Sequence, residues 1–159
     1  MAWSLLDQYE PEVLILVAGA SPVMRPLQYQ TWETFCASWH TDVKIAFTWL
    51  REALLKPLPP GSTVVVMSSG AAINRSPASA GYAGSKATQR FIAGYAQDES
   101  RRAGRDITVT AVLPRMTPSG DVGRRGVRAY AARGGQTEEA YLKQPGELLT
   151  PETARSAIA

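Results

Sequence analysis

The sequence predicts an α/β fold in which a parallel sheet is flanked by helices. Three apolar segments of strand length alternate with two longer segments whose apolar residues recur at three- and four-residue steps. Strands and helices that alternate in this way build parallel sheets with right-handed crossovers. The 159 residues, 45% hydrophobic and 19% charged, have the ordinary composition of a single globular domain.

The three strands are predicted from runs of β-branched and other apolar residues. They are Val13–Val17, Ser62–Ser69 and Ile107–Leu113, and Gly or Pro follows closely after each. The first run is apolar throughout, as in a strand that is buried on both faces. If its outer edge is exposed, that edge is a site for pairing or aggregation. We therefore expect the chain to be either oligomeric through this edge and its Trp-rich helix or marginally soluble.

Two helices and a variable tail complete the predicted order. The helices are Thr31–Leu55, which is amphipathic, and Gly81–Ala103, which Gly104 ends. Beyond Pro114 the sequence is rich in Gly and Arg, and we expect a mobile lid or substrate loop followed by short helices that start near Thr137 and Thr150. The predicted organisation is one partial domain over residues 1–159, with its core at 12–114 and the lid region at 115–159.

The most informative residues lie between the second strand and the second helix. Ser69 comes where the strand ends, and Tyr82 follows it by thirteen residues. The carboxyl ends of parallel strands line the ligand crevice of α/β proteins, so the Ser69 hydroxyl is placed to meet a ligand. Lys86 lies one helical turn beyond Tyr82. An ammonium close to a phenol favours phenolate and lowers its pKa toward the range useful for proton transfer.

This pattern resembles the active site of short-chain dehydrogenases/reductases. The strand-end Ser69, the thirteen-residue gap, the Tyr-x-x-x-Lys step and a later strand ending at Pro114 follow the order of that family. The resemblance covers Glu12–Pro114. It implies a Rossmann-like parallel sheet with flanking helices, of which this chain holds the carboxyl-terminal half of the doubly wound fold.

The resemblance also implies catalytic roles. Tyr82 would be the acid/base, Ser69 would orient the substrate carbonyl, and Lys86 would bind the nicotinamide ribose and lower the pKa of Tyr82. Asp42 stands where the family has the Asn of a proton relay. An Asp accepts hydrogen bonds as Asn does, but it has no amide donor and it adds a charge.

NAD or NADP is the implied cofactor, and a carbonyl or alcohol compound the implied substrate. Leu16 and Val17 replace the two Asn residues of the family's Asn-Asn-Ala-Gly segment. The resemblance further implies a homo-oligomer, with Trp32, Trp39 and Trp49 either packing or contributing to a subunit interface. The residues it places at the cofactor are Ala18, Gly19, Tyr82, Lys86, Pro114, Arg115 and Thr117.

The family's glycine-rich phosphate loop is the main departure. No Gly-x-x-x-Gly-x-Gly occurs before Val13, so the backbone N–H groups that hold a pyrophosphate are missing from the expected place. Two hypotheses follow. The chain is an NAD(P)-dependent oxidoreductase whose Met1 is a false start, or it is a shortened, inactive relative that acts by binding or assembly.

Cysteine, histidine and charge limit the remaining functions. Cys36 is the lone cysteine and His40 the lone histidine, so we expect neither a disulfide nor a metal site, and a cytoplasmic location. With a net charge of +3 and no apolar run of spanning length, neither nucleic acid nor membrane is an expected partner. One basic stretch is a solvated lid, a contact to an anionic cofactor or substrate, or a nucleic-acid contact. Its residues are Arg115, Arg124, Arg125, Arg128 and Arg133.

Overall fold

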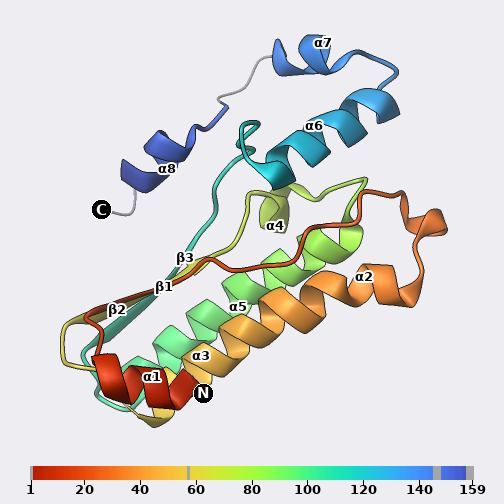
Figure 1. The fold of residues 1–159 in the computed structure, drawn as a ribbon. Coiled ribbons are helices and arrows are strands. Elements are labelled where there is room, and N and C mark those ends of the chain that lie inside the picture. Colours follow the sequence, from red (N-terminus) through yellow and green to blue (C-terminus); the bar gives the residue numbers. More distant parts are fainter. Residues whose placement is uncertain (1, 57, 145–147, 157–159) are drawn as a thin grey trace.

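The computed structural model describes residues 2–56, 58–144 and 148–156 (Figure 1). Met1, Pro57 and residues 145–147 and 157–159, which belong to the predicted single domain, lie outside the described residues. The elements are α1 (Ala2–Tyr9), β1 (Val13–Leu16), the 3₁₀ turn η1 (Leu27–Tyr29), α2 (Trp32–Ser38), the π-helical turn η2 (Trp39–Val43), α3 (Lys44–Leu55), β2 (Ser62–Met67), α4 (Ala71–Asn74), α5 (Ala80–Arg102), β3 (Ile107–Val112), α6 (Asp121–Arg133), α7 (Glu138–Leu142) and α8 (Pro151–Ser156).

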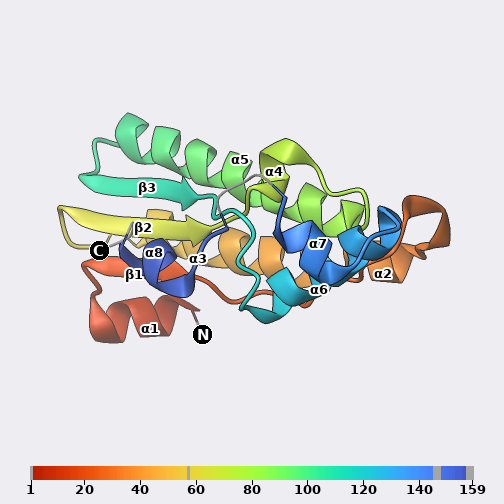
Figure 2. The same cartoon turned by 90° about the horizontal axis from the view of Figure 1, so that it is seen from above.

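The described strands form one parallel sheet in the order β1-β2-β3. Leu14 pairs with Val64, and Val64 pairs with Val109 on the other side. This confirms the predicted α/β class and the parallel strand direction. Because all three strands run the same way, their carboxyl ends meet at one edge of the sheet, where Figure 2 shows α6 and α7.

The core lies between the sheet and the helices α1, α3 and α5, which run along one of its faces (Figures 1 and 2). Leu16, Val64 and Val66 point into it from the strands. From the helices come Leu50, Ala53, Ala93 and Ala96, among others. Small residues on α5 let this helix lie close to β2 and β3.

The first strand differs from the prediction. Its side chains alternate, with Leu16 buried while Val13 and Ile15 are 58% and 44% exposed. The expectation of burial on both faces was therefore wrong for the described residues, because helices pack against one face of this sheet and the other carries exposed side chains. An all-apolar run of four or five residues is compatible with either arrangement.

The predicted helix Thr31–Leu55 is present but interrupted. Thr31 caps it by accepting a hydrogen bond from the Thr34 backbone N–H, and α2 and α3 are joined through the π-helical turn η2. Gln89 of α5 donates to the Asp42 backbone carbonyl within that turn, at 3.0 Å. A π turn re-aims the side chains it contains, and here Asp42 is directed into the protein, where it is buried.

The tail is more helical than the sequence indicated. A thirteen-residue helix, α6, occupies the part of the tail predicted to be a lid loop. Helices α7 and α8 begin at the predicted starts, and Thr137 caps α7 by accepting from the Ala140 N–H. Glycines at positions 123 and 126 hid the helical period of α6, since Gly lowers helix propensity. Within the described residues, no helix combines the length and hydropathy that a bilayer crossing requires.

Helix α5 contains two glycines with opposite surroundings, which allow a direct test of its packing. A Cβ on Gly81 would lie 2.1 Å from the Phe35 carbonyl oxygen of α2, whereas one on Gly94 would meet nothing within 4 Å. We predict that Gly81→Ala destabilises the protein by about 1–3 kcal/mol through overpacking. The matched change Gly94→Ala should instead add about 0.5–1 kcal/mol by raising helix propensity. Urea denaturation measures both, and similar effects of the two changes would contradict this packing.

Candidate active site

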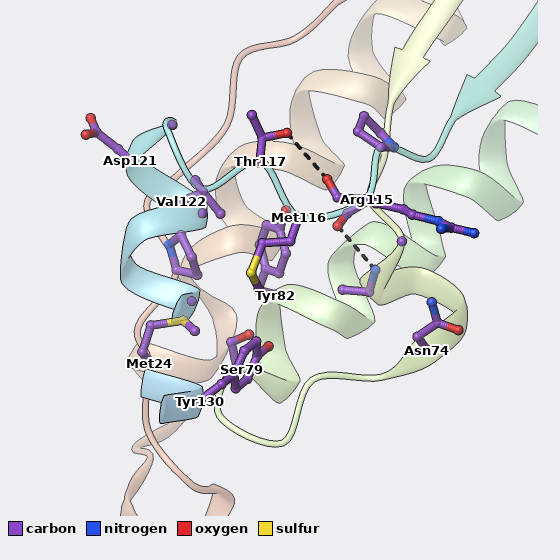
Figure 3. A pocket seen from close by; sticks show the side chains of 18 of the residues that line it. Met24, Asn74, Ser79, Tyr82, Arg115, Met116, Thr117, Asp121, Val122 and Tyr130 are labelled. Carbon is purple, nitrogen blue, oxygen red and sulfur yellow. Dashed lines mark hydrogen bonds between the residues drawn. The ribbon is translucent and has the colours of Figure 1, made fainter. Parts of the chain in front are cut away.

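The carboxyl ends of the strands open into a pocket of about 630 Å³ (Figure 3). Ser69 enters it from the end of β2 and Tyr82 from the first turn of α5. Pro114, Arg115 and Thr117 line it from the segment after β3. Five of the residues singled out in the sequence are therefore brought together, whereas Ala18, Gly19, Asp42 and Lys86 do not line this pocket.

Ser69 and Tyr82 lie beside each other in the pocket, close enough for the Ser69 hydroxyl to act on the pKa of the phenol. The Ser69 Oγ also accepts the backbone N–H of Ala71 at the start of α4, at 3.2 Å. This bond uses one of the two lone pairs of the Ser69 oxygen, and the hydroxyl proton is left to be donated to the Tyr82 oxygen or to a ligand oxygen beside it. This pair supplies the directional hydrogen bonds that a carbonyl or alcohol group requires.

Lys86 lies beneath Tyr82 rather than at the pocket surface. Its Nζ is 5.6 Å from the centre of the Tyr82 ring and donates to the Met67 backbone carbonyl at 3.1 Å. It also forms an ion pair with Asp42 Oδ2 at 3.1 Å, with both side chains less than a tenth exposed. Because a buried charge is costly unless it is paired, this contact fixes the lysine in one place.

Asp42 is the link between the end of β1 and α5. Its Oδ1 accepts the backbone N–H of Ala20 at 2.7 Å. Its Oδ2 faces Lys86 without making a hydrogen bond of good geometry. The carboxylate also fills the space beside Gly19, where a Cβ would come within 2.9 Å of Oδ2. Ala18 and Gly19 are exposed next to this pair, in the segment that follows β1.

The pKa of Tyr82 is raised above its ordinary value of 10.0, chiefly because the phenol is buried. The hydrogen bond from Ser69 opposes this rise, whereas the negative charge of Asp42 adds to it. The expectation of a net lowering of this pKa by Lys86 is thus not met, because burial of the phenol and the negative charge of Asp42 raise it. The neutral phenol is the form the fold favours, so its contribution to stability is complete below pH 10.0 and is lost as the pH rises through the higher folded-state pKa.

Several pocket residues escaped the sequence reasoning. Met24, Ser79 and Met116 line the pocket, and so does Tyr130 of α6, whose hydroxyl is hydrogen-bonded to Ser76. Nothing local marks them as functional, because they come from loops and from a helix that the Gly-rich sequence concealed. Only the contact between distant segments reveals them.

The basic stretch is mostly a solvated helix face. Arg124 pairs with Asp121, and Arg128 pairs with Glu138, all four with exposed side chains. These ion pairs neutralise two arginine charges that could otherwise bind an anionic ligand. In the part of the chain that the structure describes, no cluster of His, Cys, Asp or Glu could hold a metal ion.

The comparisons with known proteins place the fold. No protein-family model matches the chain, and no curated protein matches its sequence. Solved structures do match it. A short-chain dehydrogenase family protein from Francisella tularensis has a TM-score of 0.78 at 18% identity, over 98% of this chain and 65% of that one. The chain therefore has the fold of short-chain dehydrogenases.

Two further structures carry bound ligands. An NAD⁺-bound xylitol dehydrogenase has a TM-score of 0.72 at 22% identity, over 89% of this chain and 56% of that one. A landomycin C-6 ketoreductase with bound NADP and rabelomycin has a TM-score of 0.61 at 24% identity, over 92% and 63%. The chain spans less than two thirds of the length of these proteins.

The charge balance around Lys86 leads to a prediction about Tyr82. Asp42→Asn removes a negative charge that raises the pKa of Tyr82 and leaves the Lys86 ammonium unbalanced, so this pKa should fall. An NMR titration of the tyrosine ring carbons measures it, with Tyr82→Phe assigning the signal. Asp98→Asn changes an exposed residue of α5, the helix that carries Tyr82, and serves as the control. It should not change the pKa of Tyr82. An unchanged or higher pKa in Asp42→Asn would show that the pair does not act on Tyr82.

Proposed function

We propose that this protein is an NAD(P)-dependent oxidoreductase of the short-chain dehydrogenase type, acting on a carbonyl or alcohol compound. The observation that carries the proposal is that Ser69 and Tyr82 line one pocket beside each other, with Lys86 one turn along the same helix and 5.6 Å from the centre of the Tyr82 ring. We propose residues 12–114 as the catalytic core and 115–159 as the lid, forming one partial domain. The lone buried thiol of Cys36 is compatible with a cytoplasmic setting.

In the direction of reduction, Ser69 and Tyr82 hold the substrate. Both hydroxyl groups donate to the carbonyl oxygen, which polarises the carbonyl and fixes its orientation. As hydride reaches the carbon, the Tyr82 proton passes to the oxygen, and the alcohol forms. Because the pKa of Tyr82 is raised, the phenol carries its proton at neutral pH and is ready to act as an acid. Oxidation of an alcohol needs the phenolate and should be favoured by alkaline conditions.

The nicotinamide end of NAD or NADP fits the residues that surround Tyr82. When bound, this group would supply or accept the hydride. Lys86 has three N–H donors, of which the Met67 carbonyl engages one while Asp42 pairs with the charge, and we assign a remaining donor to a ribose hydroxyl. The exposed backbone of the segment after β1 borders this position. The residues we propose to hold the cofactor are Ala18, Gly19, Tyr82, Lys86, Pro114, Arg115 and Thr117.

The first test is cofactor binding followed by a tyrosine substitution. Calorimetry should detect binding of NADH or NADPH at cofactor concentrations of about 1 mM or below. Tyr82→Phe should lower the rate of ketone reduction by about 10²–10⁴-fold while leaving cofactor affinity nearly intact, because it removes only the proton donor. Tyr95→Phe makes the same change on an exposed part of α5 and serves as the control.

The outcomes separate the two functional hypotheses. A folded chain that binds neither cofactor would refute the oxidoreductase hypothesis and favour a role in binding or assembly. Loss of both cofactor affinity and turnover in Tyr82→Phe would contradict the role given to Tyr82. Retained turnover would contradict it as well.

We further propose that the chain self-associates through its exposed apolar surfaces. Val13 and Ile15 lie on an edge strand, and Trp32, Phe47 and Phe91 are exposed on the helices. An exposed apolar edge strand pairs readily with another chain. Sedimentation should therefore show a homo-oligomer, and Ile15→Lys should shift it toward monomer. Thr108→Lys adds the same charge to the other edge strand, β3, as a control. A monomeric parent protein would refute this proposal.

A further inference from the structure

Helix α6 presents one face to the pocket, and that face is unusual in composition. Gly123, Gly126 and Tyr130 fall on it at steps of three and four residues. A Cβ on Gly123 would lie 1.9 Å from the Thr117 carbonyl oxygen, so the helix backbone rests directly on the segment after β3. Beyond Val122 in its first turn, α6 offers the pocket one large side chain on this face, that of Tyr130.

The ring of Tyr130 is held in place at its hydroxyl. That hydroxyl shares a hydrogen bond with Ser76, which in turn is hydrogen-bonded to Ser79. Ser76 and Ser79 are 5% and 2% exposed, so this chain of three hydroxyl groups is buried at the pocket wall. A tyrosine anchored at its tip presents a rigid ring face with little loss of entropy when a ligand binds.

The surroundings of this ring are apolar. A Cβ on Gly126 would come within 3.1 Å of Met116 Cε and 3.7 Å of Tyr130 Cε2, so the glycine makes room for the thioether beside the ring. The ring of Tyr141 in α7 packs against the Tyr130 ring in a tilted arrangement, with 6.1 Å between the two ring centroids. Figure 3 shows Met24, Met116 and Tyr130 gathered around Tyr82.

Three charged residues line the pocket, Arg75, Arg115 and Asp121, and two of them point away from Tyr82. In Figure 3 the carboxylate of Asp121 and the guanidinium of Arg115 are directed away from Tyr82. Asp121 pairs with Arg124 on the outer side of α6. The space beside the proposed reacting atoms therefore has hydroxyl groups on one side and thioethers and rings on the other.

We propose that Tyr130 is a specificity-determining residue whose anchored ring selects an uncharged substrate that carries a planar apolar group next to its carbonyl or alcohol. This inference rests on the proposed oxidoreductase function for the identity of the reacting group. The planar group lies against Tyr130 and the thioethers, and the oxygen reaches Ser69 and Tyr82. An anionic group lying against the Tyr130 ring and the thioethers would lose its hydration, and these side chains offer it no cationic partner.

Ligand binding without turnover tests this directly. The probes are 2-acetylnaphthalene, an uncharged planar ketone, and 2-naphthoate, its anionic counterpart of similar shape, titrated against the full chain by NMR. The ketone should bind at least about tenfold more tightly, because the anion is desolvated without a partner. Tyr130→Ala should weaken ketone binding about two- to tenfold, as expected for the loss of an aromatic contact. Tyr130→Phe should keep most of that affinity because it keeps the ring.

A second measurement tests the anchor. Hydrogen exchange of the α6 amides should become about fivefold faster in both Tyr130→Phe and Ser76→Ala, which break the same hydrogen bond. Tyr29→Phe and Tyr29→Ala, at an exposed tyrosine outside the pocket, are the matched controls for the two measurements.

The proposal is overturned if 2-naphthoate binds as well as the ketone, if Tyr130→Ala binds the ketone as the parent does, or if exchange in α6 is unchanged by both hydroxyl deletions. None of these readouts requires hydride transfer. A chain that binds no nicotinamide cofactor would refute the proposed function yet leave the role of Tyr130 measurable. An active enzyme in which Tyr130→Ala leaves ketone binding unchanged would refute the role of Tyr130 and leave the proposed function standing.

Discussion

The buried ion pair between Asp42 and Lys86 is the interaction on which the site depends. It joins the segment after β1, through the Ala20 N–H, to the helix that carries Tyr82, and Lys86 continues the link to β2 through the Met67 carbonyl. Three separate parts of the fold are thereby held in one arrangement. A buried pair of this kind adds little net stability but is costly to break, so it specifies position more than it stabilises the protein.

The same pair sets the chemistry of the phenol. An unbalanced ammonium would lower the pKa of Tyr82, but here a carboxylate faces that ammonium and its charge acts in the opposite direction. Burial then decides the outcome, and the phenol keeps its proton. An Asn at position 42 could retain the Ala20 contact but not this charge balance. Asp42 and the Asn of the family pattern can therefore share the structural role of this position, but only Asp42 supplies the negative charge.

Sequence patterns predicted the parts of the structure that depend on local periodicity. The three strands, the two long helices and the approach of Ser69 to Tyr82 follow from apolar spacing and from strand direction. Two features did not. The exposure of Val13 and Ile15 depends on what covers the sheet, and the helix α6 depends on glycines that pack against Thr117. Both are set by tertiary contacts, which carry no signature in a short window of sequence.

The residues that we propose for proton transfer all belong to the helix-covered side of the sheet or to the strand ends. Ser69 follows β2, Tyr82 and Lys86 lie on α5, and Asp42 lies in the turn between α2 and α3. These elements share one continuous core, to which the open face of β1 contributes no buried side chain. The core elements therefore hold the four side chains of the proposed proton-transfer site in place. Binding of a cofactor's phosphates is a separate requirement, which these four side chains do not serve, so the two capacities are physically separable.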